Sequence, residues 1–185
     1  MPVATGISLT PIRLCDADAL ASLIAGNVRH LRTYMPKVIG LGTPDSARGY
    51  LQAALDAHAS GTLFEWHIFD GNRLCGAIRL NHLELDSHKA SVGYYIGAEH
   101  QGRGLATLSV GAVVQFAFER LHLNRIELRC ASDNVASQRV AERLGFRWEG
   151  LLRQAELVEG AYLDHFVYGL LAADDAGSAG MRQAA

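Results

Sequence analysis

The 185-residue chain has few of the features that mark secreted, membrane or nucleic-acid-binding proteins. Its only cysteines are Cys15, Cys75 and Cys130, an odd and widely spaced set that predicts reduced, buried thiols rather than a disulfide framework or a zinc site. No run of about 18 apolar residues predicts a membrane span, and residues 1–10 do not resemble a signal peptide. With a net charge of −2, no basic face for nucleic acid stands out. These absences predict a cytoplasmic protein with neither a membrane nor a nucleic-acid partner.

The chain does have the composition of a globular domain. Hydrophobic residues make up 49% of it and charged residues 19%, which is typical of a folded chain able to bury a core. The length suggests one domain. We therefore predict a single domain over residues 1–171, followed by a disordered tail over residues 172–185, where small and polar residues dominate.

Hydrophobic spacing and turn residues predict the element order β-α-α-βββ-α-β-α-ββ. Asp16 is expected to cap the first helix with its side chain, and Thr43 with Pro44 marks the start of a later one. The predicted strands cover residues 7–14, 63–69, 73–85, 89–97, 125–130, 147–158 and 161–171, and the helices residues 16–27, 28–35, 44–60, 105–121 and 135–144. This order indicates an α/β (α+β) fold around a mostly antiparallel sheet of about seven strands.

The stretch "YYIGAEHQGRGLAT", residues 94–107, leads from a strand through glycines into a long apolar helix. Helix N-termini bind anions through free N–H groups, and glycine permits positive φ angles close to a phosphate. Arg103 adds a cation. A Walker loop needs a lysine that is missing here, and a dinucleotide fingerprint needs glycine where Thr107 stands.

The remaining phosphate-loop pattern is Q/R-x-x-G-x-G/A, which binds the pyrophosphate of acyl-CoA. Gln101, Gly104 and Ala106 fit this pattern. The strand before the loop and the buried helix after it are the context that the pattern requires. An ordinary glycine-containing helix entry is the alternative interpretation.

Three longer segments carry a wider similarity: "VGYYIGAEHQGRGLAT", "LNRIELRCASDNVASQRVAERLGFRWEGLLRQAE" and "YLDHFVYGLL". Together they resemble the GNAT acyltransferase superfamily, and within it the Rim-type branch of ribosomal-protein N-terminal acetyltransferases and their relatives. The resemblance covers about residues 7–171 and is most specific over residues 93–169. The segment "NVRHLRTYMP" also looks like the acceptor-side region of the family, with Tyr34 where many members carry tryptophan.

The resemblance implies the GNAT fold, with a sheet that splays at the acyl-CoA site, acetyl-CoA or another acyl-CoA such as succinyl-CoA as co-substrate, and no metal. Pantetheine would pair with the backbone of the strand near Ile96 as an added strand does. The pyrophosphate would bind the N–H groups of the glycine loop, and an Asn-x-x-Ser motif would flank the thioester. The implied cofactor-binding residues are Tyr95, Ile96, Gly97, Gln101, Gly102, Arg103, Gly104, Leu105, Ala106, Thr107, Asn134 and Ser137.

The chemistry is the attack of an amine on a thioester, which needs a base, a stabilised oxyanion and a proton for the departing thiolate. Ser137 is the predicted thiolate donor, although a serine here could simply cap its helix. Glu65 is the predicted base, with Glu84 second, and each could instead be a solvated strand residue. His67 and His82 are the other basic candidates. The run "HLELDSH", residues 82–88, is a weak metal-site alternative, so no metal is predicted.

The function predicted from these residues is transfer of an acetyl or other short acyl group from acyl-CoA to a primary amine in a ternary complex. The acceptor would be a protein N-terminus or a small amine such as an amino acid, polyamine or antibiotic. Relatives are often dimers, so a homodimer is a further expectation. A non-catalytic acyl-CoA sensor is the alternative from another class. A nucleotide-binding oxidoreductase is disfavoured by Thr107 and by the antiparallel strands before the loop.

Overall fold

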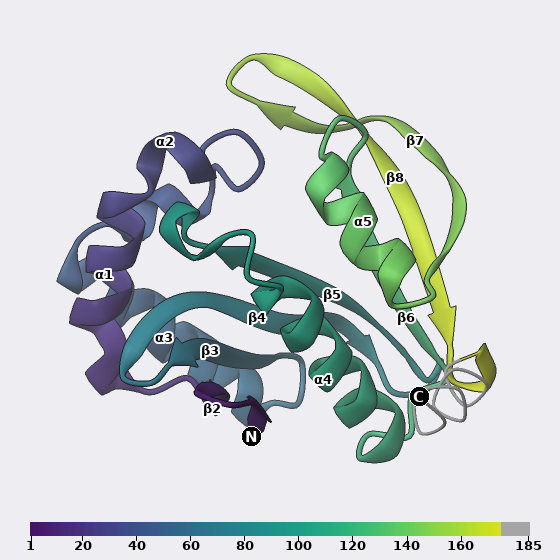
Figure 1. Cartoon of the computed structure of the whole chain (residues 1–185), viewed down its shortest axis with the longest axis horizontal. Helices are drawn as coiled ribbons and strands as arrows, with labels where there is room; N and C mark the ends of the chain where they lie inside the picture. The colour runs from purple at the N-terminus through teal and green to yellow at the C-terminus, as the bar shows by residue number, and fades with distance from the viewer. Residues whose placement is uncertain (175–185) are drawn as a thin grey trace.

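The computed structural model describes residues 1–174 and has one sheet in the strand order β1-β2-β3-β4-β5-β6-β8-β7 (Figure 1). Neighbouring strands are antiparallel except β5 and β6, which are parallel. The strands are β1 Pro2–Ala4, β2 Ile7–Pro11, β3 Phe64–Asp70, β4 Arg73–Glu84, β5 Lys89–Ile96, β6 Arg125–Ala131, β7 Arg147–Val158 and β8 Ala161–Leu171. The predicted mixed, mostly antiparallel sheet is confirmed. The predicted tail lies outside the described residues from position 175 onward.

Helices cover both faces of the sheet, with α4 and α5 in front of it and α3 behind it in Figure 1. The α-helices are α1 Ala17–Gly26, α2 Val28–Leu31, α3 Pro44–Ala59, α4 Leu105–Glu119 and α5 Val135–Arg143, and the short 3-10 helices are η1 Leu14–Asp16, η2 Val38–Leu41 and η3 Ala98–His100. The predicted start of α3 is confirmed, because Thr43 and Ser46 form a capping box ahead of Pro44. The second predicted helix is shorter than expected and ends at Leu31.

Two apolar clusters fill the space between the helices and the sheet. One joins α4 and α5 to the sheet, with Val110, Ile126 and Leu128 almost fully buried at its centre. The other joins α1 and α3 to the sheet around Leu20 and Leu51. The sheet is therefore the middle layer of three, and each face has its own core.

The sheet has one strand more than the seven predicted. Residues 2–4 pair with the start of β2 in a small hairpin, and Gly6 supplies the positive φ of +78° that its turn needs. The hairpin was missed because a three-residue strand carries too little alternation to be seen. Its pairing adds an outer edge beside β2.

Two further sequence predictions are wrong. Asp16 occupies the N-cap position of α1, but its side chain makes no capping bond. It bonds instead to Arg13 and to the imidazole of His67, across to β3. Cys15 is exposed rather than buried, since it lies in the turn before α1, whereas Cys75 and Cys130 are buried as expected.

The β5–β6 pair is the short junction on which the site depends. Pairing runs only from Lys89 opposite Arg125 to Val92 opposite Leu128. Beyond these four pairs, β5 continues to Ile96 and β6 continues to Ala131, but the two strands no longer pair with each other. Figure 1 shows that they diverge there. We call the space between them the split. It is the splay expected from the family resemblance.

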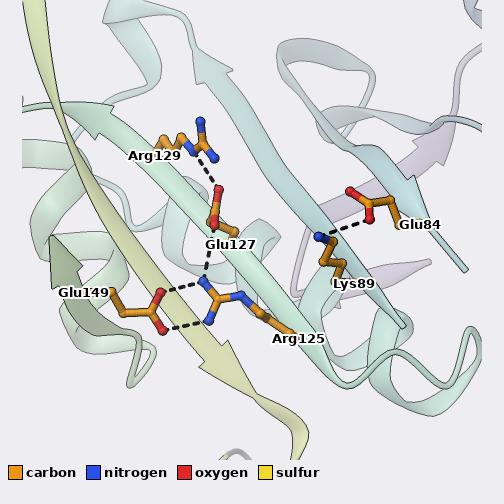
Figure 2. Close-up of polar contacts among 6 residues, drawn as sticks. All are labelled: Glu84, Lys89, Arg125, Glu127, Arg129 and Glu149. Atoms are coloured by element: carbon orange, nitrogen blue, oxygen red, sulfur yellow. Dashed lines mark hydrogen bonds and ion pairs between the residues drawn. The ribbon is translucent and has the colours of Figure 1, made fainter. Parts of the chain in front are cut away.

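Charged side chains link β6 to β7 from the first residue of β6, in the part of the strand that pairs with β5. Arg125 reaches across β8 and forms two hydrogen bonds to the Glu149 carboxylate, one of them 2.7 Å long, while Glu127 contacts both Arg125 and Arg129 (Figure 2). The crossing is possible because β8 carries Gly169 there. A methyl group at this position would collide with the Glu149 carboxylate and the Arg125 guanidinium.

Candidate functional site

The backbone of β5 presents its free polar groups to the split at Ile96. The Gly97 N–H donates to the Cys75 carbonyl at 2.8 Å, and the Tyr95 carbonyl lies so close to Gly76 on β4 that a methyl group there would collide with it. Groups of alternate residues along a strand point to opposite edges. Within the predicted Tyr95–Gly97 segment, Ile96 is therefore the residue whose N–H and carbonyl point toward the split.

The glycine loop has the backbone conformation that its sequence predicts. Gly102 and Gly104 both have φ of +74°, a left-handed conformation that favours glycine. Gly104 is the N-cap of α4 and provides no side-chain cap, so N–H groups of the first helical turn remain available to an anion. The loop from Gln101 to Gly104 is exposed, whereas Leu105 is buried and anchors the helix.

Two polar side chains of the loop already have protein partners. Arg103, the predicted cation beside the phosphates, forms an ion pair of 2.7 Å with Asp70. The Gln101 amide lies 3.0 Å from the ring nitrogen Nε2 of His30, at the end of α2. The positive end of α4 and the backbone N–H groups therefore remain as the main anion-binding features of the loop.

Asn27 attaches the loop to α1. Its side-chain oxygen accepts a 2.7 Å hydrogen bond from the N–H of Ala98, and its side-chain nitrogen donates to the carbonyl of Leu23. Gly97 packs directly below, where a Cβ would lie 2.9 Å from the Leu23 side chain. The buried amide thus fixes the entry to the loop against α1.

Ser137 lies on the other side of the split, at the start of α5. Its N–H donates to the Asn134 side chain, which caps the helix. Its hydroxyl lies 3.0 Å from the phenol oxygen of Tyr94 on β5. Burial raises the pKa of Tyr94 to about 12, so the phenol stays protonated at neutral pH. The Ser137 hydroxyl also bonds to the buried Cys130 thiol, which limits the rise that burial causes in the pKa of that thiol.

A cavity of about 240 Å³ opens beside β5 on the face covered by α1 and α3. Apolar residues line it together with the charged residues Lys37, Glu65 and Arg79. The lining residues are Met35, Lys37, Val38, Leu41, Tyr50, Glu65, Ala77, Ile78, Arg79, Gly93, Tyr94 and Tyr95. Residues 93–95 belong to the part of β5 that pairs with β4 but not with β6, so the cavity borders the split.

Glu65 is the one carboxylate among the lining residues of this cavity, and 6% of the residue is exposed. Both of its oxygens accept hydrogen bonds from the Tyr50 hydroxyl. Burial raises the pKa of Glu65 above its ordinary value, although the Tyr50 bond and the charge of Arg79 oppose the rise. Burial and the neighbouring carboxylate also raise the pKa values of Tyr50 and Tyr95. Glu65 is therefore not a solvated strand residue.

The other base candidates lie elsewhere. Glu84 pairs with Lys89 at 3.0 Å on the surface, at the end of β5 opposite the glycine loop (Figure 2). His82 is exposed, next to an irregularity in the β4–β5 pairing. His67 shares the strand face of Glu65 but is fully buried, with its Nδ1 3.0 Å from Asp16. Of the four candidates, only Glu65 lines the cavity.

Two contacts connect the segment after α2 with the C-terminal half. Arg32 forms an exposed ion pair with Glu159, at the turn between β7 and β8. Tyr34 bonds to Asp133 in the loop before α5, and its pKa is raised, chiefly by burial and then by that carboxylate. Both contacts span from the cavity side to the Ser137 side, and we call them the bridge.

Within residues 1–174 there is no group of three or more histidine, cysteine or acidic side chains placed to hold a metal ion. The helices of this part of the chain are also too short or too polar to cross a membrane.

Comparisons with known proteins identify the family to which this geometry belongs. Residues 7–147 match the family described as acetyltransferase (GNAT) domain, and the chain belongs to that family. It is an acyl-CoA-dependent N-acetyltransferase by fold and family. The predicted resemblance to the Rim-type branch is also confirmed, because proteins of that branch match this chain in both sequence and structure.

Three similar proteins cover nearly the whole chain. YdaF of Bacillus subtilis (strain 168) is 36% identical over 84% of this chain and 86% of its own. The ribosomal-protein-serine acetyltransferase of Escherichia coli (strain K12) is 32% identical over 90% of this chain and 93% of its own. A solved structure of RimL, a ribosomal L7/L12 alpha-N-protein acetyltransferase in complex with coenzyme A, is 28% identical with a TM-score of 0.89 over 95% of this chain and 98% of its own.

Three polar residues of the site were not singled out from the sequence. Tyr94 is part of the quoted glycine-loop stretch but has no motif of its own. Tyr50 is 15 residues from Glu65 and Asn27 is 71 residues from Ala98, so their contacts depend on the fold. Only the position of Tyr94, two residues before the strand ends, could have indicated that its side chain lies near the split.

Proposed function

We propose that the chain transfers an acetyl group from acetyl-CoA to the N-terminal amine of a protein. Support comes from the full-length similarity to a ribosomal-protein-serine acetyltransferase, which includes the segment after α2 and the β7–β8 turn. The Arg32–Glu159 contact of the bridge connects these two regions. The predicted small-molecule acceptors stay an alternative, because a cavity of about 240 Å³ could also hold a short amine.

The cofactor residues of the proposal are those of the sequence prediction, with two refinements. Ile96 is the backbone partner of pantetheine, because the polar groups of Tyr95 and Gly97 point toward β4. The N–H groups from Gly102 to Thr107 hold the pyrophosphate at the positive end of α4. Arg103 contributes only if it leaves Asp70, with which it is paired.

The reaction proceeds by direct attack. The neutral amine attacks the thioester carbon, and Glu65 takes its proton directly or through water. The Ile96 N–H stabilises the oxyanion as the N–C bond forms. The C–S bond then breaks, and the sulfur receives a proton from Ser137, while solvent takes the proton from Glu65 and restores the one lost by the serine. The raised pKa of Glu65 suits a base that works near neutral pH.

The proposal is tested with three acceptors and one donor. Free thiol release is measured with acetyl-CoA and a peptide with a free N-terminal serine, the same peptide with a blocked N-terminus and an internal lysine, and a polyamine. A kcat/KM for the free N-terminus at least tenfold above the others is expected. A preference for the polyamine would support a small-molecule acceptor. Binding of CoA without turnover of any amine would favour a sensor. Succinyl-CoA in place of acetyl-CoA tests the acyl group.

Ser137→Ala tests the donor role. We expect kcat to fall much more than the affinity for acetyl-CoA, because the hydroxyl acts when the thiolate departs. Equal losses in both would indicate a binding role. The cytoplasmic location and the homodimer expected from the sequence stay predictions, to be tested by cell fractionation and by sedimentation.

A further inference from the structure

The Tyr94 side chain joins the two halves of the sheet at the split. It leaves β5 two residues beyond Val92, the last residue paired with β6, and its hydroxyl meets Ser137 on α5. The ring packs against the core formed by α4 and α5. Within residues 1–174 this is the only hydrogen bond between a β5 side chain and α5.

We propose that Tyr94 is a positioning residue, which directs the hydroxyl proton of Ser137 toward the sulfur of the acyl donor. The two oxygens are 3.0 Å apart, so one hydroxyl must donate to the other. If the phenol donates, the Ser137 oxygen is an acceptor on that side, and its own O–H can turn from the Cys130 thiol to the sulfur of the acyl donor. This inference rests on the proposed role of Ser137 and deepens it.

The surroundings of the pair favour the phenol as donor. Burial keeps Tyr94 protonated, so it has a proton to give throughout the working pH range. The Ser137 N–H is held by Asn134, which fixes the backbone from which the hydroxyl projects. When the serine proton moves to sulfur, negative charge develops on the serine oxygen, and the Tyr94 O–H stabilises it in a partly buried site.

A cycle of four proteins tests the inference: wild type, Tyr94→Phe, Ser137→Ala and the double variant. Tyr94→Phe should lower kcat about tenfold, equivalent to about 1.4 kcal/mol, with the KM for acetyl-CoA changed less than about twofold. In the Ser137→Ala background the same substitution should change kcat little, because the phenol then has no hydroxyl to direct. Thermal unfolding of all four separates this effect from loss of fold.

Tyr168→Phe is the matched control, since Tyr168 is a buried tyrosine in the same core and its hydroxyl makes no hydrogen bond within residues 1–174. Its kcat should equal that of the wild type. Equal kcat losses from Tyr94→Phe with and without the Ser137 hydroxyl would overturn the inference, as would a loss confined to KM. A Ser137→Ala protein with normal kcat would instead overturn the proposed donor role, whatever Tyr94 does.

Discussion

The hydroxyl of Tyr50 on α3 lies 2.6 Å and 2.8 Å from the two carboxylate oxygens of Glu65 on β3. This contact holds a buried acid at the wall of the cavity that borders the split. It also stabilises the ionised form, because the bond opposes the rise that burial causes in the pKa of Glu65. Tyr50 thus helps to set the pKa of Glu65, and with it the fraction of the predicted base that is ionised at a given pH.

The first prediction concerns pH. Because the pKa of Glu65 is raised, kcat/KM should increase with pH and level off with an apparent pKa above 4.5. Glu65→Gln should remove this limb and lower kcat by about 10²–10⁴-fold, the usual contribution of a general base. Tyr50→Phe removes a bond that lowers the pKa, so its acid limb should move to higher pH. A limb unchanged in both variants would exclude Glu65 as the base.

The second prediction concerns the glycine loop. Gly104→Val places a β-branched residue at φ of +74°, at a cost of about 1–2 kcal/mol. No atom within 4 Å obstructs the new Cβ, so the fold should survive and the loop should shift instead. CoA should then no longer raise the melting temperature at millimolar concentration.

Gly49→Val is the control for this variant, because Gly49 is an exposed residue of α3 with the same open space around it. It should keep the thermal shift with CoA. Retained micromolar affinity in Gly104→Val would remove the loop from the acyl-CoA site.

The third prediction concerns the bridge. Arg32→Glu places two carboxylates together at the β7–β8 turn and should raise the KM for a peptide acceptor up to about fivefold, since an exposed pair contributes about 0.2–1 kcal/mol. The KM for acetyl-CoA should not change. The exchanged pair Arg32→Glu with Glu159→Arg should restore the acceptor KM. An acceptor KM that stays raised in the exchanged pair would argue against an electrostatic bridge. So would an increase from Arg32→Glu that is unchanged at high salt.

The fourth prediction concerns stability in mild acid. Burial lowers the pKa of His67 below its ordinary value, against the opposing bond from Asp16. In the unfolded chain the His67 ring takes up a proton near pH 6.5, whereas in the folded chain it does so only at lower pH. The stabilising contribution of the neutral ring is complete above pH 6.5 and is lost as pH falls through the lower folded pKa. His67→Gln should flatten this part of the curve of unfolding free energy against pH. An unchanged slope would contradict the prediction.

Local chemistry made much of the fold predictable. The "DGN" turn gives the β3–β4 hairpin, with Gly71 at φ of +57°, and Gly145 ends α5 with φ of +82°. Thr43 and Asn134 cap their helices with the expected side-chain bonds. Each of these signals acts within a few residues, so the sequence alone is sufficient to read them.

Contacts between distant segments were not predictable in the same way. Asp16 has the sequence context of a helix cap, but the fold brings His67 and Arg13 to it, and a charged partner competes successfully with the helix end. A solvated position was an alternative for Glu65, because no sequence pattern indicates that Tyr50, 15 residues away, will bond to it. The role of a polar side chain depends on which elements pack over it, and that requires the fold.

Within residues 1–174, the four-pair contact between β5 and β6 is the only strand pairing that holds β1–β5 to β6, β8 and β7. If the chain were pulled apart from residues on β3 and β8, this ladder is where rupture should begin, because few hydrogen bonds share the load. An acyl-CoA bound between the strands would add bonds in parallel with the ladder. The rupture force in a single-molecule experiment should therefore report occupancy of the site without any turnover.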